Sequence, residues 1–393
     1  MHNPSELLPV APPSPTGILV ACAETGRGKP FMTGFFWWFS LVLTGAGPAG
    51  QIAYVSGTEQ EDQCVCIVEV TSGAVSRLGT GTRDGAPAWS PDGSKLAFST
   101  SQPEGLGICI GYPDGAAPRR LKHERKWNRN PRWSPDGAFL VYEASDGQGF
   151  DHQIVVYDLN ADTESTWAGG RTGFMRPVWL PNMRIFDLAL PSEGLMWKDA
   201  QDQAVKDYEP GKERLLLSVG LTGPTGKYST DLFLVTPTAS ARLLAQNNYV
   251  EWAAEPSPDG RNIAFESNDG GDREVFVASG GAVTDVTNHR AADWNPAWSP
   301  DGEWIAFESF RDGRRGVYRV HAGTARVSPV ATDAISDNWW PSWSPDGKWI
   351  AFASNRTGHP EIFVASPTGD DVQQITNHPG LDLAPAWRPE VKQ

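Results

Sequence analysis

The chain has 393 residues and a formal net charge of −14. Neither nucleic acid nor an anionic membrane surface attracts an acidic protein, so this charge argues against both as partners. Hydrophobic residues make up 39% of the chain and charged residues 20%, as in globular proteins, and the 41 glycines and 32 prolines indicate many turns between short elements.

Residues 1–50 are expected to form a separate N-terminal part. Residues 1–26 are rich in proline and small residues and predict a disordered tail. Arg27 and Lys29 then precede the short apolar run 31–43 (FMTGFFWWFSLVL), and small residues follow it. This order is typical of a secretory signal peptide, and the run is too short to form a stable membrane span. We therefore expect a periplasmic or extracellular protein; the alternative is a cytoplasmic one in which this run packs on the following domain.

From residue 51 onward the chain repeats one motif. Copies stand at 87–98 (PAWSPDGSKLAF), 131–142 (PRWSPDGAFLVY), 296–307 (PAWSPDGEWIAF) and 341–352 (PSWSPDGKWIAF), and 254–265 (AEPSPDGRNIAF) keeps the turn without the tryptophan. Regular recurrence of this kind is the signature of a repeat protein. Pro-Asp-Gly supplies the residues of a tight turn, and aromatic and β-branched residues flank it, so each copy predicts a hairpin.

A single hairpin cannot bury its faces, so the copies are expected to stack as blades. We predict an all-β fold, a β-propeller of four-stranded blades that spans residues 51–393. The first unit starts in mid-repeat at Ile52, whereas the last one stops after its first strand, at 384–389. The C-terminal strand is therefore expected to pair with the N-terminal blade and close the ring.

The blade count depends on one irregular region. Second strands are expected to start near Ile185 and Leu215, which are closer together than other neighbouring copies. Both copies resemble the repeat, so we favour eight blades, of which the fourth is degenerate and lacks a strand. The alternative is seven blades, with about residues 181–214 as an insertion.

Antiparallel order places all Pro-Asp-Gly turns on one rim of the propeller. The loops between second and third strands and the links between blades then lie on the opposite rim, here called the variable rim. Short polar residues stand five positions before the repeat tryptophan, and in two links a tryptophan stands four positions before it. We expect these residues to ring the funnel mouth of a central channel: Asp84, Asn128, Asp293, Trp294, Asn338, Trp339 and Asp382.

This ring could receive cationic side chains, a metal or sugar hydroxyls, and its tryptophans could stack on a sugar or an apolar partner. The alternative is that the aspartates and asparagines bond the backbone of their own turns. His123, His289 and His378 recur before the repeat tryptophan and could bind a metal or act as a base, but the repeat itself explains them as well. The sequence thus assigns no catalytic residue, metal site or cofactor.

Glutamates and cysteines recur at two other places. Glu143, Glu266 and Glu308 end second strands and predict salt bridges on the variable rim, each of little energetic value. Cys64 and Cys66 are expected on one face of a strand, which is too extended for an easy disulfide between them.

The phrase Trp-Ser-Pro-Asp-Gly-x-x-Ile-Ala-Phe, followed by a Ser-Asn-Arg-x-Gly loop and a Glu-Ile-Phe-Val strand, resembles the repeat of TolB-like bacterial propellers. The likeness covers residues 51–389 and is strongest in 254–389. It implies an exported, non-catalytic platform that binds a protein or peptide at the funnel mouth. Some polysaccharide lyases are similar propellers, so a carbohydrate-active enzyme or a sugar-binding module is the alternative.

Overall fold

In a computed structural model of the chain, the residues described are 47–58, 62–79, 83–103, 105–147, 152–170, 174–180, 215–222, 228–235, 240–242 and 249–390. The chain divides into two compact units, 1–45 and 46–393, and all described residues belong to the second. The predicted tail and the apolar run 31–43 thus lie outside the described residues. Within the described ranges every regular element is a strand, and no helix there is long and apolar enough to cross a membrane.

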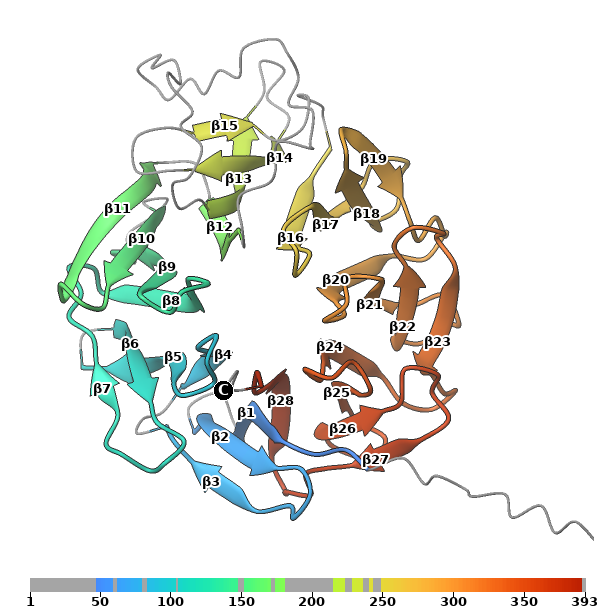
Figure 1. The fold of residues 1–393 in the computed structure, drawn as a ribbon, viewed down its shortest axis with the longest axis horizontal. Helices are drawn as coiled ribbons and strands as arrows, with labels where there is room; N and C mark the ends of the chain where they lie inside the picture. The colour runs from blue at the N-terminus through green and yellow to red at the C-terminus, as the bar shows by residue number, and fades with distance from the viewer. Residues whose placement is uncertain are drawn as a thin grey trace, which may run out of the picture. The chain divides into compact units, whose positions relative to one another are not determined.

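The strands pair in groups of four, and each group is called a blade and named after its first strand (Figure 1). The β28 blade contains β28 (Leu381–Trp387), β1 (Gln51–Gly57), β2 (Cys64–Glu69) and β3 (Val75–Arg77). The β4 blade contains β4 (Gly85–Trp89), β5 (Leu96–Gln102), β6 (Gly105–Gly111) and β7 (Arg119–Arg120). The β8 blade contains β8 (Trp127–Trp133), β9 (Phe139–Ser145), β10 (His152–Asp158) and β11 (Thr163–Gly170). A parallel contact between Leu106 and Trp127 joins the last two blades into one eight-stranded sheet.

Four further blades follow along the chain. The β12 blade contains β12 (Phe174–Trp179), β13 (Leu215–Thr222), β14 (Tyr228–Val235) and β15 (Ser240–Arg242). The β16 blade contains β16 (Glu251–Pro256), β17 (Asn262–Ser267), β18 (Glu274–Ser279) and β19 (Ala282–Asp285). The β20 blade contains β20 (Asp293–Trp298), β21 (Trp304–Ser309), β22 (Gly316–His321) and β23 (Val327–Ala331). The β24 blade contains β24 (Asn338–Trp343), β25 (Ile350–Ser354), β26 (Glu361–Ala365) and β27 (Val372–Gln374).

The Pro-Asp-Gly turns form the predicted hairpins. In the β20 blade, the Ser299 hydroxyl donates to Asp301 Oδ1 and accepts the backbone N–H of Trp304 at 2.9 Å. Asp301 Oδ1 also accepts the N–H of Glu303 at 3.0 Å, and Gly302 has a φ of 72°, which suits glycine. The serine and aspartate side chains therefore satisfy backbone donors of the turn and fix the start of the second strand.

The first strands of the blades lie around a common centre (Figure 1). They contact one another in the order β4, β8, β12, β16, β20, β24 and β28, and β28 contacts β4 again. Strand β28 pairs antiparallel with β1, and Ile52 lies opposite Trp387, as the mid-repeat start of the chain predicts. The buried apolar side chains fill the space between neighbouring blades; in one such cluster, Ile67 of the β28 blade packs with Phe98 of the β4 blade.

In five of the blades the repeat tryptophan joins the blade to the preceding one. Trp298 Nε1 donates to the backbone oxygen of Glu255 at 2.9 Å, across the boundary between two blades. The same bond recurs between Trp89 and Ala386, Trp133 and Ala88, Trp179 and Arg132, and Trp343 and Ala297. Trp387 is also buried, but its Nε1 has no hydrogen-bond partner among the residues described.

The irregular region pairs differently from the arrangement that we favoured. Trp179 lies opposite Leu215. This is the register in which Trp298 lies opposite Ile305 in the β20 blade. In the arrangement with eight blades, Trp179 and Leu215 were expected to belong to different copies of the repeat. Residues 181–214, which separate β12 from β13 along the chain, lie outside the described residues.

The indole bond between blades can be tested with two matched substitutions. We expect Trp298→Phe to lower the free energy of unfolding by about 1–2 kcal/mol more than Trp387→Phe, because only the first leaves a buried carbonyl without its donor. Urea unfolding of both variants measures the difference. Equal losses in the two variants would show that ring volume, and not the hydrogen bond, sets the cost.

Candidate functional site

On the variable rim, first strands contain β-bulges whose central residue has a positive φ. These residues are Asn130, Arg176, Ala253, Asn295, Trp340 and Ala384. A bulge turns the strand locally and points backbone N–H groups away from the ladder, so these groups need other acceptors.

Glutamates of the preceding blades supply these acceptors. Glu308 Oε1 accepts the N–H of Trp340 at 2.7 Å, and the same contact joins Glu143 to Arg176 and Glu266 to Asn295. The predicted salt bridges are confirmed, since Arg129, Arg273 and Arg315 pair with these three carboxylates in turn. The glutamates are nevertheless buried and hold neighbouring blades together, which the sequence did not show.

Two of these arginines are stacked between tryptophans. The Cζ atom of Arg273 lies 4.1 Å from the ring centroid of Trp252 and 5.5 Å from that of Trp294. Arg315 Cζ lies 5.4 Å from Trp294 and 5.7 Å from Trp339. We call the resulting series Trp252, Arg273, Trp294, Arg315, Trp339 the Trp–Arg ladder. It crosses three blades, and cation–π attraction adds to its ion pairs.

The ladder contains both tryptophans of the predicted ring and one that we missed. The rings of Trp294 and Trp339 stack against guanidinium groups of the protein itself, so the ring faces that meet these groups are not open to a ligand. Trp252 escaped notice because its blade has Pro256 where the others have the repeat tryptophan from which we counted. Counting back four positions from Pro256 would have found it.

The polar members of the predicted ring are buried, each with an exposed fraction of 0 or 1%: Asp84, Asn128, Asp293, Asn338 and Asp382. They do not simply bond their own turns. Asn128 Nδ2 donates to the backbone oxygen of Leu106 in the preceding blade, and Asp84 Oδ2 accepts the N–H of Val65 there. Glu251, which sequence counting also missed, accepts the N–H of Leu232 in the same way. Asp84, Asn128 and Glu251 therefore link neighbouring blades.

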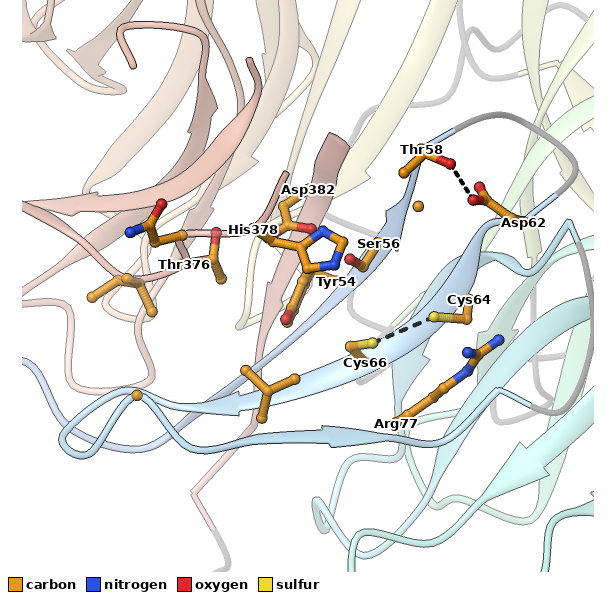
Figure 2. Close-up of a pocket in the computed structure, with 15 residues that line it drawn as sticks. Tyr54, Ser56, Thr58, Asp62, Cys64, Cys66, Arg77, Thr376, His378 and Asp382 are labelled. Carbon is orange, nitrogen blue, oxygen red and sulfur yellow. Dashed lines mark hydrogen bonds between the residues drawn. The ribbon is translucent and has the colours of Figure 1, made fainter. Parts of the chain in front are cut away.

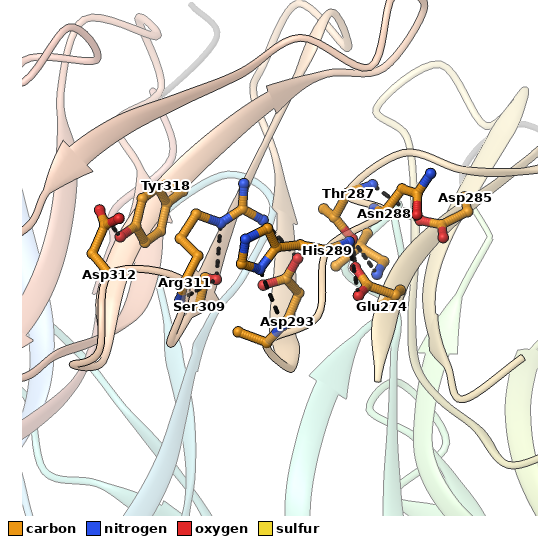
Figure 3. Close-up of polar contacts among 12 residues, drawn as sticks. Glu274, Asp285, Thr287, Asn288, His289, Asp293, Ser309, Arg311, Asp312 and Tyr318 are labelled. Atoms are coloured by element: carbon orange, nitrogen blue, oxygen red, sulfur yellow. Dashed lines mark hydrogen bonds and ion pairs between the residues drawn. The ribbon is translucent and has the colours of Figure 1, made fainter. Parts of the chain in front are cut away.

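Asp293 of the β20 blade belongs to a buried group of charges that also includes Glu274 of the β16 blade (Figure 3). Its Oδ2 accepts Arg311 Nη2 at 2.7 Å. Glu274 lies beside it and accepts the hydroxyl of Thr287 and the N–H of His289. Burial, together with the neighbouring Asp293 carboxylate, raises the pKa of Glu274 to about 8. Desolvation likewise raises the pKa of Asp293, although Arg311 opposes this effect.

A cavity of about 700 Å³ lies between the β24 and β28 blades (Figure 2). Strands β1 and β2 and the link that leads into β28 line it, and its walls include Asp382. The link approaches β1 closely at Gly380, where a Cβ atom would lie 2.5 Å from the backbone oxygen of Gly57. Cys64 and Cys66 face the cavity from one face of β2, as predicted, with free thiols whose sulfurs are 3.5 Å apart. Their hydrogen bond lowers the pKa of the Cys64 thiol and raises that of Cys66.

The three recurring histidines bond their own surroundings. His123 Nε2 accepts the N–H of Ile108, His289 Nδ1 that of Ala291, and His378 Nδ1 that of Gly380. In the parts of the chain that the structure describes, no three side chains of histidine, cysteine, aspartate or glutamate are placed to hold a metal ion.

The buried carboxyl of Glu274 makes stability depend on pH. The folded-state pKa of about 8 exceeds the ordinary value of 4.5, so the folded protein retains a proton that the unfolded chain releases between these values. This contribution is complete below about pH 4.5 and is lost as the pH rises through 8. We expect the melting temperature of Glu274→Gln, relative to wild type, to rise from pH 6 to pH 9 in calorimetry. Glu303→Gln, at an exposed turn, is the control; a parallel course of all three curves would contradict the assignment.

Comparison with known proteins places the fold. A family model described as the TolB beta propeller domain matches residues 46–217 and 227–339. No curated protein sequence matches the chain. Solved structures similar to it include TolB from Acinetobacter baumannii, with a TM-score of 0.53 and 18% identity over 87% of this chain and 67% of that one.

Two peptidase propellers are also similar. The β-propeller domain of the Trilobed protease from Pyrococcus furiosus has a TM-score of 0.61 and 13% identity over 85% of this chain and 94% of that one. The acylaminoacyl peptidase of Pyrococcus horikoshii has a TM-score of 0.58 and 13% identity over 84% of this chain, which spans only 52% of the peptidase. At these identities the structures show a shared fold and nothing further.

Proposed function

Because the chain belongs to the family of TolB β-propeller domains, we propose that it is a non-catalytic propeller that binds a protein or peptide on its variable rim. The observation that carries this proposal is a set of three exposed apolar side chains, two of which contact the Trp–Arg ladder. We call Phe310, Ile335 and Trp340 the rim patch; their exposed fractions are 38, 80 and 37%.

Two residues of the rim patch, Phe310 and Trp340, contact tryptophans of the Trp–Arg ladder. The rings of Phe310 and Trp294 meet edge to face with centroids 5.5 Å apart, and those of Trp340 and Trp339 do so at 6.3 Å. Rigid aromatic side chains beside arginines are the usual energetic centres of protein interfaces, because they lose little conformational entropy on binding. The buried ring residues Asp293 and Asn338 act in this proposal as supports of the rim.

The carbohydrate alternative receives less support. A sugar would need an open aromatic face, whereas guanidinium groups lie over Trp294 and Trp339. The peptidase propellers among the similar structures share the fold, and at their low identity they carry no activity over to this chain.

We further propose a propeller of seven blades that β28 closes. The four-stranded pairing of the described groups and the register of Trp179 with Leu215 support this count over the eight blades that we first favoured. The pairing of β28 with β1 supports the closure.

The rim patch can be tested by peptide selection. We expect a display library panned against the purified chain to yield peptides whose affinity falls about tenfold or more in the double variant Phe310→Ala, Trp340→Ala, since each lost anchor costs on the order of 1 kcal/mol or more. Fluorescence anisotropy measures the affinities. Val283→Ala, at an exposed residue of the outer strand β19, is the matched control. Equal affinity for the double variant and the control would refute the rim patch, and binding of a polysaccharide panel that requires the patch would favour the carbohydrate alternative.

Export is a separate part of the proposal and rests on the signal-like order of residues 27–50. We expect mass spectrometry of the native protein to find a mature chain without the apolar run 31–43. A mature protein that keeps this run would contradict cleavage.

A further inference from the structure

Two neighbouring blades hold an arginine in the same way. In the β20 blade, Arg311 donates from Nε to Ser309 Oγ at 2.9 Å and from Nη2 to Asp293 Oδ2 at 2.7 Å. Its Cζ lies 5.1 Å from the ring centroid of Phe307 and 5.0 Å from that of Tyr318. Figure 3 shows Arg311 with Ser309, Asp293 and Tyr318. A hydroxyl, a side-chain oxygen of aspartate or asparagine, and an aromatic ring together form what we call an arginine seat.

The β24 blade repeats the seat with its own residues. Arg356 donates to Ser354 Oγ at 3.0 Å and to Asn338 Oδ1 at 2.8 Å. Its Cζ lies 5.6 Å from Phe352 and 4.7 Å from Phe363. In both blades the arginine stands two positions after the serine.

The strand register locates the equivalent place in the β28 blade. Ser309 pairs with Asp293, Ser354 with Asn338, and Ser56 with Asp382. Tyr54 precedes Ser56 by two positions, as Phe307 and Phe352 precede their serines, so the first ring of the seat is present. Cys66 takes the place of the second ring, because it pairs with Tyr54 as Phe363 pairs with Phe352.

The β28 blade lacks the arginine. Thr58 stands two positions after Ser56, and its hydroxyl bonds Asp62 instead. Asp382 is completely buried and interacts with the carboxyl group of Glu361, but no ion pair reaches its carboxylate among the residues described. A buried carboxylate without a cationic partner is costly.

The seat without an arginine borders the cavity between the β24 and β28 blades. Tyr54, Ser56 and Asp382 all line that cavity (Figure 2). Its volume of about 700 Å³ lies within the range of small-ligand sites and exceeds what one guanidinium group fills. The remaining space can take the stem and backbone of a peptide residue.

The charged neighbours of Asp382 leave its negative charge uncompensated. Burial and the nearby Asp382 carboxylate raise the pKa of Glu361, whose Oε1 lies 3.4 Å from His359 Nε2. Arg77 also lines the cavity, but it lies beside Cys64. None of these groups forms an ion pair with Asp382, which faces the cavity beside His378.

We propose that this cavity binds the guanidinium group of an arginine in a partner peptide, which takes the place of the arginine that the β28 blade lacks. The inference rests on the proposed peptide-binding function and extends it to a second contact. The bound group donates to Ser56 and Asp382 and stacks on Tyr54, as Arg311 does on its own seat. Lysine carries a compact ammonium and cannot supply this planar set of donors.

Ligand-observed NMR titration of the full chain with N-acetylarginine amide tests the proposal, at about 0.15 M ionic strength to suppress general attraction to an acidic protein. N-acetyllysine amide and N-acetylcitrulline amide are the matched probes; citrulline has nearly the same shape without the charge. We expect the arginine probe to bind about tenfold or more tightly than either. Equal binding of the arginine and lysine probes would overturn the proposal. Free arginine that binds at least tenfold more tightly than N-acetylarginine amide would also overturn it, since the site would then suit a small molecule and not a peptide residue.

Three variants localise the binding. Thr58→Arg supplies the missing side chain, so we expect it to abolish binding of the arginine probe and to raise the melting temperature. Thr58→Gln, with a long but neutral side chain, leaves binding within about twofold of wild type. Asp382→Asn is expected to fold, because Asn338 occupies the same position in the β24 blade, and to weaken binding about tenfold. Wild-type binding in both Thr58→Arg and Asp382→Asn would overturn the seat.

The rim-patch variant separates this inference from the proposed function. Phe310→Ala, Trp340→Ala should lose its selected peptides and keep the arginine probe. If the double variant loses the selected peptides but wild type does not bind the arginine probe, the seat alone is refuted. If wild type binds the probe but the double variant keeps the selected peptides, the seat is supported and the rim patch is refuted.

Discussion

The hydrogen bond from the repeat tryptophan to the backbone of the preceding blade is the interaction on which the rest of the structure depends. Trp298 illustrates it: the indole is buried between two sheets, and its N–H reaches a carbonyl that pairing within one sheet leaves free. Apolar burial alone would let two sheets slide or rotate, since it has no direction. A directed bond at the same place in five blades fixes how each of these sheets follows the one before it.

The contacts on the variable rim depend on this alignment of neighbouring blades. Once neighbouring first strands are fixed, Glu308 of one blade meets the bulge N–H of Trp340 in the next, and Arg315 can pair with this glutamate while it lies between two tryptophans. The bond from Trp340 to Glu308 and the stacking of Arg315 on Trp339 thus use groups from two blades. A binding surface built in this way is held by the sheets themselves, which is the rigidity that recognition of a partner favours.

The sequence predicted the repeating hairpins, but it was less informative about which residues of neighbouring blades contact one another. Period and turn chemistry predicted the hairpins and the pairing of β28 with β1. They located Asp293 and Asn338 along the chain, but strand position does not tell which neighbouring blade will bury a side chain, so an open ring was expected where buried links occur. Trp252 was missed because Pro256 replaces the landmark residue. The arginine seats left a readable signal, Ser-x-Arg at the end of second strands, but its meaning required the register and the distances to the facing strand.

The first and last described strands meet within one blade, where β1 pairs with β28. Trp387 of β28 lacks the indole bond to the preceding blade that Trp89, Trp133, Trp179, Trp298 and Trp343 make. The seat without an arginine spans the β1–β28 pair, with Asp382 on the tail strand and Ser56 on the head strand. A ligand held by both would act as a clasp, and its occupancy would be thermodynamically tied to keeping head and tail together.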